Sequence, residues 1–325
     1  MIKKMCGLLT SALMAFAFVV ALSSCVSTSV ESSIPELTKY DDALLWEING
    51  TDSEGNSSKL YVLGTIHFGD DRLYPLPQSV ESAFESSDKY VAELSSEDFG
   101  KMVPELVARQ VASMGRETAR AAETGKPLLS YFTEDEINFF IQVYGSIEIV
   151  NQLALFEPWV LMSGLTVLPA AYSGLDATKG IDPYLINKAG ENNKKVEGLD
   201  TLDIQLDLLE FGDWDTQLAM TKDLLKELMD DPDVAGKEMA ELYDTYLTYD
   251  ENLLAEVMAA DYESETEAYA KEYHDEMFVA RNTAWANKFV EYLEQGGTTF
   301  IFAGAGHFVG EDSVFNIMKA NNTLK

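Results

Sequence analysis

The chain has 325 residues, of which 55 are acidic and 23 are basic, so its formal net charge is −32 at pH 7. An electrostatic field of this sign repels nucleic acid and anionic lipid, which excludes both as partners held by charge. Because 46% of the residues are hydrophobic and 11% are aromatic, the chain can bury a sizeable core, as one large domain or two closely packed halves.

The N-terminus has the pattern of a cleaved export signal. Two lysines, Lys3 and Lys4, precede an uncharged apolar run at residues 8–22, which is shorter than the ~20 residues of a membrane-spanning helix. The run ends in Leu22-Ser23-Ser24-Cys25, a small-residue cleavage site directly before a cysteine. This site resembles the bacterial lipobox, whose cysteine is lipidated and becomes the mature N-terminus.

We therefore predict a lipoprotein signal peptide over residues 1–24 and a lipid on Cys25. An ordinary secretory signal beside a chance cysteine is the alternative. A lipid on Cys25 would hold the protein at a membrane of the cell envelope, facing outside the cytoplasm. Residues 25–42 are rich in Ser and Thr and predict a flexible tether, and residues 43–325 predict the folded domain.

Strand-like and helical segments alternate unevenly along this domain. Short apolar runs predict strands at residues 43–48, 60–66, 90–94, 195–197 and 298–303. Residues 101–149 and 201–292 have helical patterns, and Thr133 followed by Glu136 is a capping-box start. Strands at both ends with helices between them favour an α/β fold, with α+β as the alternative. We expect a compact domain whose N- and C-terminal strands form one central sheet flanked by many helices.

Two of the three histidines stand in matching frames. His67 ends Gly64-Thr65-Ile66-His67 and His307 ends Gly304-Ala305-Gly306-His307, and each frame follows a predicted strand. A side chain at the point where a strand runs into a loop is well placed for function. We expect both imidazoles to lie at one edge of the sheet, to face a cleft and to contribute little packing. A structural role is the alternative for each histidine alone.

Glu93 and Arg281 are the other candidate site residues. Glu93 ends the predicted strand next to that of His67, which makes it a candidate metal ligand or general base as well as an ordinary edge carboxylate. Arg281 lies on the apolar stripe of a predicted helix, three to four residues from Phe278 and Trp285. A buried arginine needs a carboxylate or an anionic ligand, so either a structural ion pair or a site is predicted.

These segments, taken in order, resemble the TraB/GumN family, which includes the animal Tiki proteins. The resemblance rests on the two Gly-x-x-His frames, Ala92-Glu93-Leu94 and Arg281-Asn282, and extends to Gly180-Ile181-Asp182, Gly198-Leu199-Asp200-Thr201 and Gln205. It spans residues 44–319; the family commonly has Glu where this chain has Asp200. It implies a compact α/β domain with the histidines in a central cleft.

The resemblance also implies a hydrolase, since Tiki members are described as divalent-metal-dependent proteases. On that hypothesis His67, His307 and Glu93 would hold one zinc, manganese or cobalt ion with an open position for water. Arg281 would orient Glu93 or stabilise an oxyanion, and a peptide or protein would be the substrate.

Two further hypotheses stay open. The resemblance extends to a wider superfamily with the erythromycin esterases, which look like metal-free hydrolases. In a hydrolase of that kind His67 would be the general base, Glu93 would fix its tautomer and Arg281 would carry the developing negative charge. In a binding lipoprotein, the histidines would hold a metal or a ligand such as haem without turnover. The sequence gives no sign of the oligomeric state.

Overall fold

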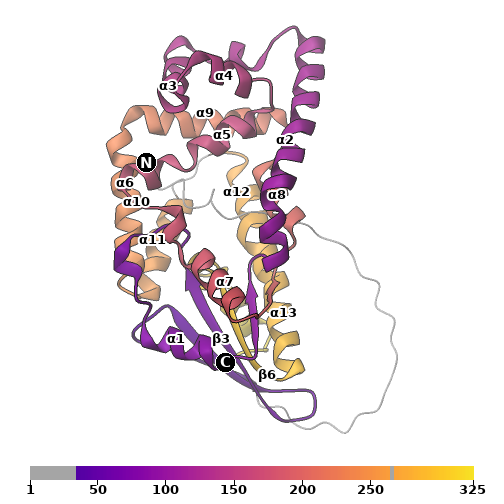
Figure 1. Ribbon diagram of the computed structural model, residues 1–325, viewed down its shortest axis with the longest axis vertical. Helices are drawn as coiled ribbons and strands as arrows, with labels where there is room; N and C mark the ends of the chain where they lie inside the picture. Colours follow the sequence, from indigo (N-terminus) through magenta and orange to yellow (C-terminus); the bar gives the residue numbers. More distant parts are fainter. Residues whose placement is uncertain (1–33, 264–266) are drawn as a thin grey trace, which may run out of the picture.

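The computed structural model describes residues 34–263 and 267–325. The predicted signal peptide, Cys25 and the first half of the predicted tether, up to residue 33, lie outside these residues. The described part is a mixed sheet with helices on both faces and a helical lobe at one end of the long axis (Figure 1), which confirms the expected α/β fold. Within these two ranges, no helix is both long and apolar enough to cross a membrane.

The sheet has six strands in the order β1-β2-β3-β6-β4-β5. The first three pair antiparallel, while β3, β6, β4 and β5 are parallel neighbours. The strands are β1 (Glu36–Lys39), β2 (Leu45–Thr51), β3 (Ser57–Thr65), β4 (Lys89–Ala92), β5 (Val196–Gly198) and β6 (Gly297–Gly304). The strands at the two ends of the chain share this sheet, as predicted, and four strands end at the same edge.

Strand β1 corrects the predicted tether. Glu36–Lys39 lies inside residues 25–42, yet it pairs with Trp46–Asn49 of β2 as the edge strand. The C-terminus also pairs with this segment: Lys325 donates its backbone N–H to the carbonyl of Pro35, the residue before β1, at 3.0 Å. An edge strand needs only backbone pairing, so its polar composition resembles that of a linker. The folded domain therefore begins before residue 43.

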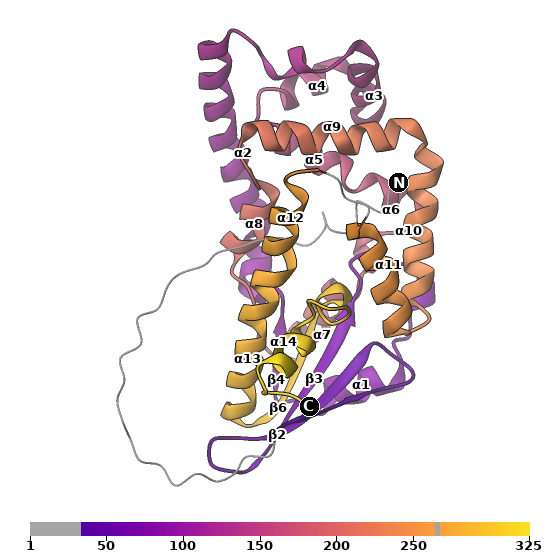
Figure 2. The same ribbon diagram turned by 180° about the vertical axis from the view of Figure 1, so that it is seen from behind.

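Helices cover both faces of the sheet. On one face lie α1 (Gln78–Glu85) and α7 (Ile181–Glu191), and on the other α13 (Arg281–Gln295) and α14 (Val314–Ala320) (Figures 1 and 2). Strand β6 is covered on both sides and its residues from Thr299 onward are buried, as its uninterrupted apolar sequence predicts. The main hydrophobic core is built around this strand.

The remaining helices form the lobe and two groups of helices that connect the lobe to the sheet (Figure 2). On one side are α2 (Ser96–Thr124), α8 (Leu202–Leu209) and α12 (Ala270–His274), and on the other α6 (Leu168–Ser173), α10 (Pro232–Tyr246) and α11 (Glu251–Glu263). Between them at the far end lie α3 (Glu134–Tyr144), α4 (Ile147–Leu153), α5 (Pro158–Leu165) and α9 (Trp214–Asp230). The capping box of Thr133 and Glu136 starts α3 as predicted, and a second apolar core fills the lobe.

Single short turns complete the secondary structure: η2 (Asp71–Leu73), η3 (Leu128–Tyr131), η4 (Ala177–Lys179) and η6 (Ala305–His307) are 3-10 turns, and η5 (Asp275–Ala280) is a π-helical turn.

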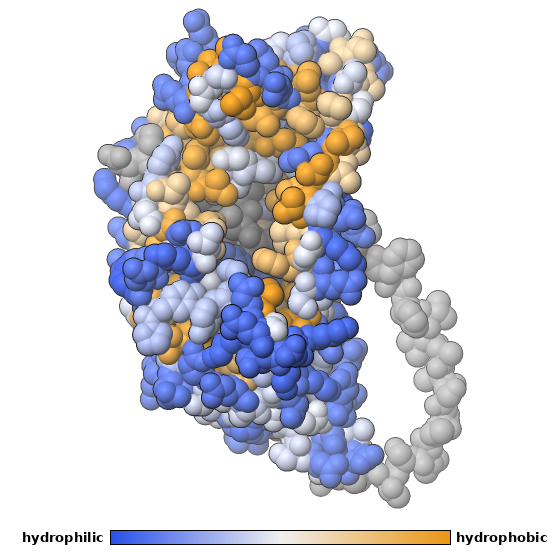
Figure 3. Space-filling model, viewed as in Figure 1, coloured by the Kyte–Doolittle hydropathy of each residue, from blue (hydrophilic) through white to orange (hydrophobic). Residues whose placement is uncertain are grey.

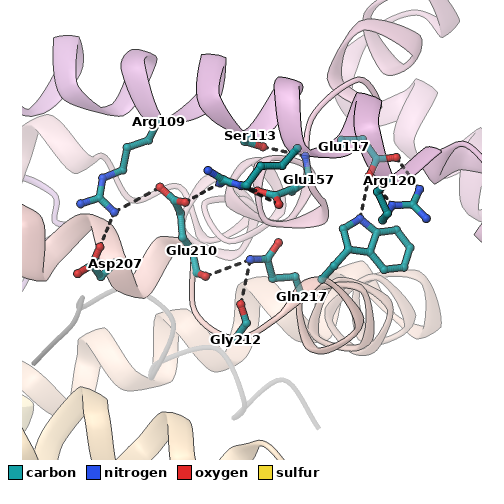
Figure 4. A network of polar contacts seen from close by, with 11 residues as sticks. Arg109, Ser113, Glu117, Arg120, Glu157, Asp207, Glu210, Gly212 and Gln217 are labelled. Atoms are coloured by element: carbon teal, nitrogen blue, oxygen red, sulfur yellow. Dashed lines mark hydrogen bonds and ion pairs between the residues drawn. The ribbon is translucent and has the colours of Figure 1, made fainter. Parts of the chain in front are cut away.

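The long helix α2 is attached through a largely polar face (Figure 4), with Met102 and Leu106 packed against a small apolar cluster near its start. Arg109 pairs with Asp207 of α8, and Arg116 contacts Glu157 at 2.5 Å and Glu210 at 2.8 Å. Farther along, the Trp214 indole N–H donates to Glu117 at 2.9 Å. Because this face carries the attachment, the apolar side chains on its other side stay exposed.

Candidate functional site

Four side chains meet where the parallel strands end. His67 follows β3, His307 follows β6, Glu93 follows β4, and Asp200 follows β5. All four of these strands run in the same direction, so their carboxyl ends lie at one edge, the usual position of a site in an α/β sheet. The structure thus brings the two matched histidines and Glu93 together, as their positions in the sequence suggest.

Arg281, the first residue of α13, also reaches this edge of the sheet. Its Nη2 donates to Glu93 Oε2 at 2.7 Å and its Nε donates to Asp200 Oδ2 at 2.9 Å. The π-helical turn η5 comes immediately before it, and such turns often mark functional positions. Arg281 is 3% exposed, so the guanidinium is a buried cation held between two carboxylates.

The two carboxylates share this one cation and differ in their ionisation. Burial raises the pKa of Glu93, but Arg281, the histidines and the Gly304 N–H at 2.8 Å outweigh it, so the net pKa lies well below the usual range. Burial raises the pKa of Asp200, and attraction to Arg281 only partly offsets it. The Trp285 indole N–H also donates to Asp200, at 2.8 Å. Glu93 is therefore the firmly ionised member.

His307 is fully enclosed and both of its ring nitrogens are engaged. Its Nε2 accepts from Nη1 of Arg281 at 3.1 Å, which leaves Nδ1 as the protonated nitrogen, 2.6 Å from the amide oxygen of Asn282. Burial and the Arg281 charge lower the pKa of His307 well below its usual value, so the ring is neutral. Contrary to the expectation of a cleft-facing residue, His307 is part of the packed interior.

His67 is held quite differently. Its Nδ1 lies 2.9 Å from Oδ2 of Asp182, and Thr65 donates its hydroxyl to the other oxygen of Asp182 at 2.8 Å. Because an ionised carboxylate can only accept, Nδ1 carries the proton and Nε2 is left as the basic nitrogen. The nearest carboxylate oxygen to Nε2 is Glu93 Oε1 at 4.0 Å, beyond hydrogen-bond distance. The His67 side chain is 32% exposed.

The electrostatic setting of His67 favours its charged form. Burial lowers the pKa of His67, but attraction to Asp182, the hydrogen bond to that carboxylate and attraction to Glu93 outweigh it. The net result is a pKa raised from 6.5 to about 9. The imidazole is therefore protonated at neutral pH and becomes a base above it.

Two glycines allow the close packing at this edge. A side chain at Gly180 would place its Cβ 2.3 Å from the carbonyl oxygen of His67, so only glycine lets α7 start there and present Asp182. A Cβ at Gly64 would lie 3.0 Å from the Cα of Ala305, where the turn η6 packs on β3. The glycines of the motifs thus serve close approach of two backbone segments.

An open apolar pocket lies beside the two histidines, with about 710 Å³ of empty space that includes open solvent. It is lined by the strand-end segments Thr65, Ile66, His67, Phe68 and Gly304, Ala305, Gly306, His307, and by Met239, Leu242, Tyr246, Leu254, Met258 and Phe278. Figure 3 shows that the molecule is hollowed between the helical lobe and α7, with apolar side chains along both sides of the hollow. His67 is thus a titratable group at an apolar pocket, as at many catalytic sites.

The donor set does not suit the predicted divalent metal. His307 has no lone pair to offer while Nε2 accepts from Arg281, and the guanidinium would repel a cation at that position. Glu93 is likewise occupied by Arg281 and by the N–H of Gly304. Within residues 34–263 and 267–325, no group of three or more His, Cys, Asp or Glu side chains is arranged to hold a metal ion. The metal stays a prediction, and the geometry favours the metal-free alternative.

Sequence reasoning named His67, Glu93, Arg281 and His307, and it gave no role to Asp182 or Asn282. Both missed residues orient a histidine, from Nδ1 in each case. Asn282 directly follows Arg281, and Asp182 belongs to the Gly180-Ile181-Asp182 segment at the start of α7. The glycine next to a helix start was the available signal for Asp182.

Comparisons with known proteins identify relatives of this chain. The sequence profile of the TraB/PrgY/gumN family matches residues 44–323. An uncharacterized protein of Treponema pallidum (strain Nichols) is 31% identical over 308 residues, which cover 94% of this chain and 88% of that protein. No solved structure matches the chain.

Proposed function

The chain belongs to the TraB/PrgY/gumN family, and we propose that it is an extracytoplasmic hydrolase, anchored by a lipid on Cys25, in which His67 is a general base that needs no metal. The observation that carries this proposal is the pairing of His67 with Asp182 beside an apolar pocket. A carboxylate on Nδ1 fixes one tautomer of an imidazole and directs the other nitrogen at the reacting group, as in hydrolytic triads.

The reaction proceeds by addition of water to a carbonyl carbon. Nε2 of His67 takes a proton from water while the water oxygen bonds to the carbon of an ester or amide. The resulting tetrahedral oxyanion collapses, the bond to the leaving oxygen or nitrogen breaks, and the imidazolium returns its proton to the leaving group. Asp182 stabilises the imidazolium throughout and remains ionised.

Glu93 and Arg281 are positioning residues in this scheme. Glu93 Oε1, 4.0 Å from Nε2 of His67, adds to the negative potential that stabilises the imidazolium. Arg281 holds Glu93 in place, and its hydrogen bonds to Glu93, Asp200 and His307 use its donors inside the protein. This assignment replaces the catalytic role first considered for Arg281, because its guanidinium is 3% exposed.

The predicted lipobox supports a location at the membrane surface, outside the cytoplasm. The predicted lipobox lies before the folded domain, and the large negative charge offers no attraction to anionic lipid, so the anchor would supply the membrane contact. A peptide substrate is what the family resemblance implies. Ester and amide substrates share the reaction above, and the pocket rather than the base decides between them.

The test is hydrolysis of a panel of para-nitrophenyl esters and quenched peptides by wild type and variants. His67→Gln and Asp182→Asn should each lose activity by a factor of roughly a hundred or more, because the base or its tautomer is lost. His274→Gln is the matched control, since His274 contacts Asp312 and does not line the pocket. Full activity in His67→Gln, or loss of activity on adding a chelator, would contradict the proposal.

A further inference from the structure

We propose that the substrate carries a neutral hydrocarbon chain, acyl in kind, that lies in the apolar pocket beside His67. This inference rests on the proposed hydrolase and names its substrate class: an ester or amide of an apolar carboxylic acid.

The side chains of the pocket offer hydrocarbon and little else. Met239, Leu242, Leu254 and Met258 come from α10 and α11, and Phe278 lies opposite on η5. Methionine has an unbranched, flexible side chain that adapts to ligands of irregular shape. Apart from Nε2 of His67, the polar atoms of the lining side chains already have partners: Tyr246 donates its hydroxyl to the carbonyl of Gly64 at 2.7 Å, Thr65 donates to Asp182, and both ring nitrogens of His307 are engaged.

Three backbone groups at or beside this pocket already have partners and are not available to a peptide. The carbonyl of Ile66 accepts from the N–H of Ile181 at 3.1 Å, the carbonyl of Gly64 accepts from Tyr246, and the N–H of Gly304 donates to Glu93. Peptide-binding clefts commonly pair the peptide with an open strand edge. A peptide chain inside this pocket would bury N–H and C=O groups without partners, at a cost of a few kcal/mol each. A hydrocarbon chain has no such groups.

Charge selects a neutral ligand over a free acid. Glu93, Asp182 and Asp200 lie at the edge where the pocket ends, and the chain as a whole carries a net charge of −32. Arg281 and the protonated His67 offset these carboxylates locally, so it is the field of the whole chain that disfavours an anionic ligand, whereas an ester or amide is neutral. Hydrolysis of the carbon–oxygen bond of an ester yields an alcohol and a carboxylate that keeps the hydrocarbon chain. The same field then favours release of that product.

The side chains at the rim of the hollow are apolar, like those that line the pocket. Helix α2 leaves Val103 71% exposed, Val107 50% and Val111 57%, at four-residue spacing on one face. Figure 3 shows apolar side chains along α2 where it borders the hollow. Since α2 is attached through its arginine and glutamate face, this exposed apolar stripe does not hold the helix in place. None of these valines lines the pocket, so the stripe is a separate apolar surface.

Binding is tested separately from turnover. The probes are diphenylhexatriene, an uncharged hydrocarbon that fluoresces when shielded from water, and methyl decanoate as a neutral competitor. The protein is the full chain with Cys25→Ala, so that no lipid anchor competes. We expect saturable binding of diphenylhexatriene and its displacement by methyl decanoate. An N-acetylated hydrophobic peptide amide should displace the probe much more weakly.

Two tryptophan substitutions on α11 form a matched pair. Met258→Trp fills the pocket and should weaken probe binding by roughly tenfold, which corresponds to about 1.4 kcal/mol. Leu253→Trp lies on the same helix, is 40% exposed before the change and does not line the pocket, so it should leave binding within about twofold. Among para-nitrophenyl acetate, hexanoate and dodecanoate, Met258→Trp should favour shorter esters and Met258→Ala longer ones.

The outcomes separate this inference from the proposed function. No binding of diphenylhexatriene, equal weakening by both tryptophan variants, or preferential displacement by the peptide would each overturn the hydrocarbon pocket. Binding that responds to Met258 while no ester or amide is hydrolysed would support the pocket and reject the hydrolase.

Discussion

Nη1 of Arg281 lies 3.1 Å from Nε2 of His307, so a guanidinium occupies the position where the second matched histidine would bind a metal ion. The two Gly-x-x-His frames are adjacent in the sheet but one residue out of register, because Gly304 pairs with Thr65 and not with Gly64. The histidines lie beyond the paired residues, with His307 in the 3-10 turn η6, so the two chain segments leave the sheet differently. The frames look alike in sequence, yet the His67 side chain is 32% exposed and His307 is fully buried.

The two histidines should therefore respond differently to alanine. His307→Ala removes a fully buried ring, takes one acceptor from Nη1 of Arg281, which keeps only the Met277 carbonyl, and deprives the amide oxygen of Asn282 of its ring donor. These losses should lower the free energy of unfolding by about 3 kcal/mol. His67→Ala, at a 32% exposed side chain, should cost about 1 kcal/mol or less. Urea denaturation measures both. Equal losses would mean that the two side chains have the same surroundings.

Activity should rise with pH over an unusual range. If the base is His67, with its pKa raised to about 9, the active free base increases about tenfold per pH unit below that value. The logarithm of kcat/KM should then climb with a slope near one and level off around pH 9. Asp182→Asn removes the anion that raises the pKa, so its residual activity should level off at lower pH. A plateau already reached below pH 7 in wild type would exclude this His67.

Much of the fold was predictable because its signals are local. The strand at Gly297–Gly304 is an uninterrupted apolar run, and the start of α3 has a capping box, so both could be placed from neighbouring residues. Strand β1 could not, because Glu36–Lys39 gains its structure by pairing with β2 and with the C-terminal residue Lys325. Its own residues have no apolar alternation that distinguishes them from a linker.

The sequence could predict which residues form the site, but not which chemical role each of them has. His67, Glu93, Arg281 and His307 could be named because each stands at a strand end or on an apolar helix face. That only His67 keeps an exposed side chain depends on how each segment leaves the sheet, with His307 in the turn η6, and no local pattern reveals this. The partner of His67, Asp182, lies 115 residues away in sequence, and its approach depends on the absence of a side chain at Gly180.

Metal analysis tests the predicted divalent ion directly. The chain purified without chelator or added metal should contain less than one equivalent of zinc, manganese or cobalt, because Arg281 and Asn282 occupy both nitrogens of His307. Dialysis against chelator should leave hydrolysis unchanged. Stoichiometric metal that disappears in both His67→Gln and His307→Gln would restore the shared metal site, and would require Arg281 to move away.

The lipid anchor is tested by fractionation. Cys25→Ala should convert a membrane-bound, detergent-extracted protein into a soluble or unprocessed one, because the predicted lipid supplies the membrane contact. Ser27→Ala is a neighbouring control that leaves the predicted cysteine intact. Membrane fractionation and mass spectrometry of the N-terminus give the result. A Cys25→Ala protein that stays in the membrane and is cleaved at the same place as wild type would show that lipidation is wrong.

The buried cation should be the costliest side chain to remove. Arg281→Met leaves Glu93 and Asp200 enclosed without their shared partner, and breaking such a buried pair typically costs about 3–5 kcal/mol. Arg281→Lys should also fail, because a single ammonium cannot reach Glu93, Asp200 and His307 with the planar fork of a guanidinium. Adding Glu93→Gln to Arg281→Met should recover most of the lost stability, since burial already raises the pKa of Asp200 and lets it take up a proton. Activity should not return, because His67 then lacks the nearby Glu93 anion.

Arg72→Met is the control: its side chain is 53% exposed, and loss of its surface pairs should cost less than about 1 kcal/mol. Denaturant melts of these variants decide the matter, and strictly additive losses for Arg281 and Glu93 would mean that the two side chains do not interact.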